Sequence, residues 1–113
     1  MVTGYASALV VTLVVEAAVY GVGLPRLGPV SRRTAVVAGL VVNLVSHPVA
    51  WFALWPALRA VVGRGPAFVA VEALVCLGEW AALARWRPFD RPLLAVMVLI
   101  ANAASIVGGA VIA

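Results

Sequence analysis

Four long apolar runs, separated by short breaks rich in proline, glycine and arginine, constrain this sequence more than any other feature. The runs cover residues 2–24, 34–57, 66–86 and 92–112, and each is close to the ~20 residues that an α-helix needs to cross a bilayer. The hydrophobic fraction is 65%, whereas soluble globular domains are apolar in about half of their residues. We therefore predict an all-α polytopic membrane protein, a bundle of four transmembrane helices that forms one domain over residues 1–113.

The arginines in the breaks predict how the helices are oriented. The net charge of +4 comes from arginine alone, because the sequence contains no lysine. Cytoplasmic loops of membrane proteins collect basic residues, so we expect loops one and three in the cytoplasm and both termini outside the plasma membrane. This bias accounts for the basic charge without nucleic-acid binding. Loops one and three hold Arg26, Arg32, Arg33, Arg85, Arg87 and Arg91, and loop two holds Arg59 and Arg64.

Aromatic residues near the ends of the runs fit this orientation. Tryptophan and tyrosine side chains favour the boundary between hydrocarbon and water. We expect an outer group of Tyr5, Trp51, Phe52, Trp55 and Phe68, and an inner group of Tyr20, Trp86 and Phe89.

The two halves of the sequence resemble each other. A Val-Glu-Ala triplet occurs in the first and third runs, and an Asn-x-x-Ser motif begins at Asn43 in the second run and at Asn102 in the fourth. By depth, Glu79 is a closer counterpart of Glu16 than Glu72, the glutamate of the second triplet. The pattern predicts two tandem two-helix repeats, related by an axis along the membrane normal, with polar residues at their interface.

Polar side chains inside the apolar runs mark the candidate site. A charged group that faces lipid at the centre of a helix costs about 3 kcal/mol, so three glutamates would oppose insertion by roughly 9 kcal/mol. We expect them to face the interior, a water-filled cavity or a partner protein. At a rise of ~1.5 Å per residue, seven candidates lie within about 6 Å of the midplane. They are Glu16, Asn43, His47, Glu72, Glu79, Asn102 and Ser105.

Helical spacing places several of these residues in pairs on common faces. Side chains that are three, four or seven positions apart lie on one side of a helix. The pairs are Asn43 with His47, Glu72 with Glu79, and Asn102 with Ser105. Pro48 has no N–H, so it frees the carbonyl of Leu44, and a kink at this depth would widen the cavity.

Carboxyl, imidazole and amide groups at one depth favour proton or cation handling, since histidine relays protons near neutral pH. Our leading hypothesis is a small four-helix membrane protein whose cluster binds protons or a metal cation in support of transport. Carboxylate and imidazole groups also suit a divalent metal ion as cofactor. The candidate ligands for such an ion are Glu72, Glu79 and His47.

Other functions remain open. The polar face could dock an accessory or assembly subunit onto a larger membrane complex, and the simplest role for Asn102 and Ser105 is hydrogen bonding between helices. A membrane-embedded metal-dependent enzyme is the third hypothesis, although the sequence contains no His-Glu-x-x-His or Cys-x-x-Cys motif. Four short helices enclose little interior, so we expect a homo-oligomer or a larger complex. No motif identifies a family.

Overall fold

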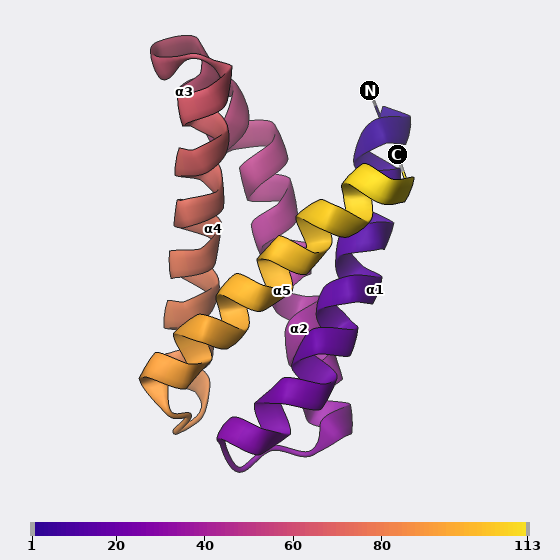
Figure 1. Cartoon of the computed structure of the whole chain (residues 1–113), viewed down its shortest axis with the longest axis vertical. Helices are drawn as coiled ribbons and strands as arrows, with labels where there is room; N and C mark the ends of the chain where they lie inside the picture. The colour runs from indigo at the N-terminus through magenta and orange to yellow at the C-terminus, as the bar shows by residue number, and fades with distance from the viewer. Residues whose placement is uncertain (1, 113) are drawn as a thin grey trace.

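A computed structural model describes residues 2–112 and confirms the prediction of an all-helical chain. No strand occurs in this described range. Figure 1 shows the arrangement of the helices. They are α1 (Val2–Leu27), α2 (Arg32–Val49), the π-helical turn η1 (Ala50–Leu54), α3 (Trp55–Val62), α4 (Arg64–Trp86) and α5 (Arg91–Ile112).

Four stretches are long and apolar enough to cross a membrane, as the sequence predicts. Their mean hydropathies lie between 1.7 and 2.2. The second stretch is continuous through α2, η1 and α3 and has 31 residues. The four stretches are Gly4–Leu27, Arg32–Val62, Arg64–Trp86 and Arg91–Ala110.

Two of the predicted ends are wrong, and both errors lie next to a proline. The first helix continues through Pro25 to Leu27 rather than ending at residue 24. The second continues past Pro56 to Val62 rather than ending at residue 57. Each proline lacks the N–H of one helical hydrogen bond, and the neighbouring bonds continue the helix past it. The second span ends where Gly63 adopts φ 85°, a left-handed conformation that glycine adopts at little cost.

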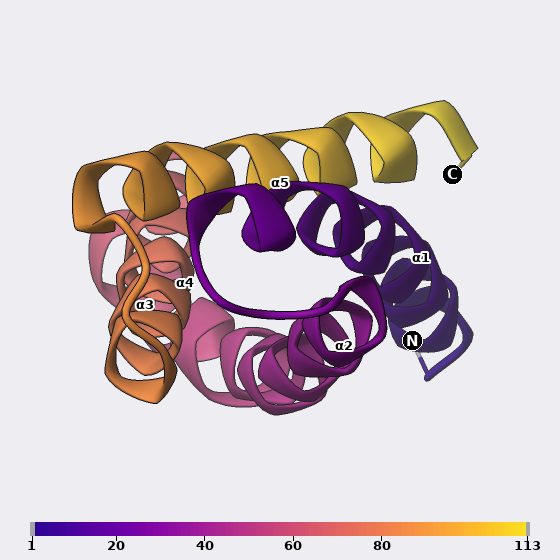
Figure 2. The same cartoon turned by 90° about the horizontal axis from the view of Figure 1, so that it is seen from below.

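The spans pack around one another in the order α1, α2, α4, α5. α1 contacts α2 and α5, and α4 contacts α5, α2 and α3, which Figure 2 shows from below. The long second span therefore begins beside α1 and ends beside α4.

The two arginine-rich loops lie together at one end of the molecule, the lower end in Figure 1, while the termini and the α3–α4 turn lie at the other. A backbone hydrogen bond of 3.3 Å from the Asp90 N–H to the Leu27 carbonyl joins the loops. Each loop also caps the helix that follows it. The Ser31 hydroxyl accepts from the Thr34 N–H at 3.2 Å, and the Asp90 carboxylate accepts from the Leu93 N–H at 3.1 Å. These caps satisfy N–H groups that an α-helix leaves free in its first turn.

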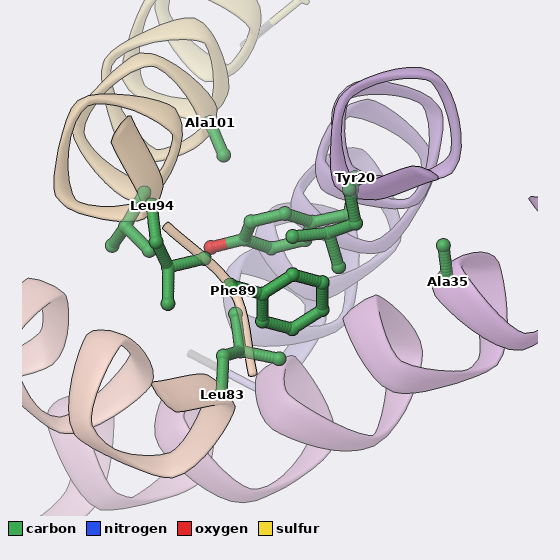
Figure 3. Packing of buried hydrophobic residues seen from close by; sticks show 8 residues of the cluster. Tyr20, Ala35, Leu83, Phe89, Leu94 and Ala101 are labelled. Carbon is green, nitrogen blue, oxygen red and sulfur yellow. The ribbon is translucent and has the colours of Figure 1, made fainter. Parts of the chain in front are cut away.

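The hydrophobic core fills the loop end of the molecule. Its residues come from the last turns of α1 and α4, the first turns of α2 and α5, and the loop between α4 and α5, and Figure 3 shows them packed together. They are Tyr20, Leu24, Ala35, Leu83, Phe89, Leu94, Val98 and Ala101. This core closes the space between the helices at the loop end.

Tyr20 reaches the centre of the molecule because Gly39 on α2 has no side chain. A Cβ atom at Gly39 would lie 2.9 Å from Cδ2 and 3.3 Å from Cβ of Tyr20. The first distance is shorter than the contact distances that Cβ atoms show in real proteins. The glycine therefore permits the close approach of α1 and α2 around the tyrosine ring.

We predict that Gly39→Ala destabilises the protein by about 1–3 kcal/mol, the usual cost of overpacking a core. Thermal unfolding in detergent micelles measures the effect. Gly78→Ala on α4 is the matched control, because a Cβ there meets no atom within 4 Å. Equal unfolding temperatures for the two variants would contradict the close packing at Gly39.

Candidate functional site

Glu79 on α4 is the centre of a buried hydrogen-bond network. Its side chain is 2% exposed. Oε1 accepts from the Tyr20 hydroxyl at 2.8 Å and from the Asn102 amide at 3.1 Å, and Oε2 accepts from the Ser46 hydroxyl at 3.0 Å. These donors lie on α1, α5 and α2, respectively. One carboxyl group therefore links all four spans.

Glu16 on α1 is buried beside this network, and its side chain is 1% exposed. Oε2 accepts from the Ser105 hydroxyl at 2.8 Å, whereas the buried Oε1 has no hydrogen-bond partner among residues 2–112. Glu16 and Glu79 are held by donors three residues apart on α5, Ser105 and Asn102, respectively. The eight arginines lie in loops or in the terminal turns of the spans. The two acids thus lie in a region where the chain provides no arginine.

Two serines connect the halves of the chain in a reciprocal way. Ser46, in the first half, donates to Glu79 in the second half, and Ser105, in the second half, donates to Glu16 in the first. Each bond joins two neighbouring spans, α2 with α4 and α5 with α1. Each half of the chain therefore supplies a hydrogen-bond donor to a buried glutamate of the other half.

The two asparagines make equivalent bonds within their own helices. The Asn43 amide donates to the carbonyl of Gly39, and the Asn102 amide donates to that of Val98, both at 2.9 Å and four residues back. Asn102 also reaches Glu79. Both side chains are buried, with exposures of 2% and 6%. Their amide groups are therefore held in fixed positions beside the acids.

A cavity of about 310 Å³ lies beside Glu16, and its lining comes from the parts of the spans nearer the termini and the α3–α4 turn. All four spans line it. Its polar lining consists of Thr12, Glu16, Asn43, Ser46, His47, Glu72, Asn102 and Ser105. Its apolar lining consists of Ala50, Trp51, Trp55, Phe68, Val71, Val75 and Ile106. The hydrophobic core fills the loop end of the molecule. The cavity therefore lies on the other side of the acids, toward the termini.

His47 lies in the cavity wall and belongs to an aromatic cluster. Its ring stacks on Trp51, with centroids 5.9 Å apart and planes 17° apart, and its centroid lies 5.2 Å from that of Tyr5. Nδ1 is buried and has no hydrogen-bond partner in the described part of the chain. The cluster surrounds the ring, and Nδ1 is the buried nitrogen that it leaves unpaired among the described residues.

The π-helical turn η1 shapes the wall next to His47. The α-helical pattern widens after Pro48, where the Trp55 N–H bonds to the Ala50 carbonyl five residues back. Single π-turns inside α-helices are frequent at functional sites. The wider turn brings Ala50 and Trp51 into the cavity lining.

The structure brings six of the seven predicted residues together around this cavity, and Glu79 lies directly behind it. Glu72 is half-buried in the cavity wall. Within residues 2–112, no group of three or more histidine, cysteine, aspartate or glutamate side chains is placed to hold a metal ion. The structure therefore does not assemble Glu72, Glu79 and His47 as metal ligands.

Sequence reasoning missed two members of the network. Tyr20 is expected among the interfacial aromatic residues, but its side chain is 0% exposed and bonds to Glu79. No sequence signal separates it from an interfacial tyrosine. Ser46 has such a signal, because it occupies the same place after Asn43 that Ser105 occupies after Asn102.

Comparison with known proteins finds no matching family model, no matching curated protein and no matching solved structure. The function is therefore inferred from the site itself.

We predict that Tyr20→Phe destabilises the protein by about 1.5–3 kcal/mol, the usual contribution of a hydrogen bond to a charged group. Unfolding in detergent measures the loss. Tyr5→Phe is the control, since the Tyr5 ring contacts His47 and Phe52 and the substitution keeps that ring. A double-mutant cycle with Glu79→Gln should show coupling, and purely additive effects would argue against the bond.

Proposed function

We propose that this chain is a multi-pass membrane protein that takes up and releases a proton at the paired carboxyl groups of Glu16 and Glu79, in support of transport. Four apolar spans support its insertion in a bilayer. Outward faces carry large apolar side chains such as Val14, Leu77 and Leu99, which are 58–65% exposed. This distribution suits contact with lipid, because a bilayer rejects polar groups on its hydrocarbon side.

The observation that carries the proposal is the unpaired Oε1 of Glu16, buried beside a second carboxyl group. Two adjacent carboxylates repel each other strongly where the dielectric constant is low. The chain supplies no arginine at this depth. A proton or a cation between Glu16 and Glu79 relieves the repulsion. Glu79 already accepts three hydrogen bonds, so Glu16 Oε1 is the atom left to hold the proton or cation.

The donor set favours a proton over a metal ion. A divalent cation needs several ligand oxygens or nitrogens around it. Residues 2–112 contain no group of three or more histidine, cysteine, aspartate or glutamate side chains placed to bind a metal. The metal-dependent enzyme is therefore the less favoured hypothesis.

The cavity gives the acids a route to one side of the membrane. It lies at the end that holds the termini, and the core fills the loop end. Arginines concentrate in the loops, so the positive-inside rule places that closed end in the cytoplasm. Glu16 then exchanges its proton with the outer side.

The halves of the proposed four-helix bundle are two tandem repeats related by an approximate two-fold axis. Reciprocal bonds from Ser46 and Ser105 to the glutamate of the opposite half support this relation. The equivalent bonds of Asn43 and Asn102 support it as well. Transporters built from repeats place their ion sites at the interface between them.

The accessory-subunit hypothesis needs polar groups on an outer face. The polar side chains are instead buried between the spans, with exposures of 1–9% for Glu16, Asn43, Glu79, Asn102 and Ser105. Their burial supports an internal site rather than a docking surface. A homo-oligomer stays a prediction, which the mass of the detergent-purified protein tests.

We predict that the protein, reconstituted in liposomes under an imposed pH gradient, moves protons faster than empty liposomes do. A pH-sensitive dye inside the vesicles measures the rate. Glu16→Gln should lower it to the rate of empty liposomes, because the amide cannot exchange a proton. Glu72→Gln, the same change at the half-buried wall position, should have a smaller effect. A parent protein without proton movement, or an unaffected Glu16→Gln variant, would disprove the proposal.

A further inference from the structure

Two residues of the cavity wall each carry a buried polar atom without a hydrogen-bond partner among the described residues. Glu16 and His47 both line the cavity, and Glu16 Oε1 and His47 Nδ1 are buried without a hydrogen-bond partner among the described residues. A buried polar atom without a partner is costly. A carboxylate oxygen accepts hydrogen bonds, and so does Nδ1 in the tautomer with hydrogen on Nε2. Both atoms therefore fit a ligand that donates hydrogen bonds.

The rest of the cavity wall is apolar and largely aromatic. Trp51, Trp55 and Phe68 line it on the side of η1, α3 and α4, and Ile106 lines it on α5. Aromatic faces attract cations and also cover apolar groups. The cavity thus combines an acidic floor with a hydrophobic wall.

We propose that this cavity binds a hydrophobic primary amine in its protonated form. The ammonium group donates to Glu16 Oε1, with His47 Nδ1 as a second acceptor, and the apolar body of the amine packs on Trp51 and Trp55. The inference rests on the proposed function, since it names the substrate class of the same site.

The acids and the wall exclude other ligand classes. Glu16, Glu72 and Glu79 make the cavity unfavourable for anions, and no arginine or lysine lines it. A quaternary ammonium group carries no N–H and would leave Glu16 Oε1 unpaired. A volume of about 310 Å³ is at the lower end of the usual ~300–1,000 Å³ for small-molecule sites. It therefore suits an amine with a single ring.

Amine and proton compete for the same oxygen. When the ammonium group binds, the Glu16 carboxyl group gives up its proton and the carboxylate pairs with the amine, so one cation enters as one proton leaves. Charge at the site is unchanged by this exchange. Such competition couples the movement of the amine to a proton moving in the opposite direction.

Binding of phenethylamine to the purified full-length chain in detergent tests the inference. Tryptophan fluorescence reports binding, because Trp51 and Trp55 line the cavity, and a weakly buffered solution reports proton release. We expect saturable binding with proton release. Phenethyl alcohol and phenethyltrimethylammonium, which have the same body without an ammonium N–H, should bind roughly tenfold to hundredfold more weakly. Equal binding of either analogue would overturn the inference.

Variants locate the contact. Glu16→Gln should weaken phenethylamine binding by roughly tenfold to hundredfold and abolish proton release, whereas Glu72→Gln should change both less. Unchanged binding by a folded Glu16→Gln variant would overturn the inference. If that variant does not fold, the comparison of the three ligands on the unaltered protein still tests whether an ammonium N–H is needed for binding.

The two proposals fail in different ways. If phenethylamine does not bind but proton movement in liposomes still depends on Glu16, the amine inference is wrong and the proposed function stands. If proton movement is absent as well, the proposed function is wrong too.

Discussion

The arrangement of the four spans depends on one carboxyl group, that of Glu79. Three donors from three other helices converge on it, through Tyr20, Ser46 and Asn102. Lipid tails are as apolar as the side chains, so helices in a bilayer gain little from hydrophobic burial against one another. Hydrogen bonds between the helices then specify how they pack. Small residues such as Gly39 permit the approach that these bonds require. Stability and the candidate chemistry therefore share the same atoms.

The two ends of the molecule differ in how they are filled. Aromatic and aliphatic side chains such as Tyr20, Leu83 and Phe89 pack densely at the loop end. At the other end, the π-turn after Pro48 lies beside the space that Trp51 and Trp55 line. Under the proposed function, an acid between a packed core and a cavity would exchange its proton with the cavity side.

Depth along a helix could be predicted from the sequence, but direction around it could not. A fixed rise per residue placed Glu16, Glu79 and Asn102 in one layer, and the structure brings them together. Whether Tyr20 points to lipid or inward depends on the neighbouring helix, which the sequence does not specify. The ends of the spans were missed at Pro25 and Pro56, since the helix continues past each of these prolines.

The unusual length of the second span bears on how a ligand arrives. Its 31 residues would measure about 46 Å as a straight helix, against about 30 Å of hydrocarbon in a bilayer. In the proposed membrane, tilt would relieve part of this hydrophobic mismatch and the rest would extend α3 into the headgroup layer. Arg59 on α3 lies 5.9 Å from the Trp55 ring, a pairing suited to an interfacial anchor. The mouth of the cavity would then open among lipid headgroups, and under the proposed function the membrane would concentrate an amphipathic amine there before it reached the acids.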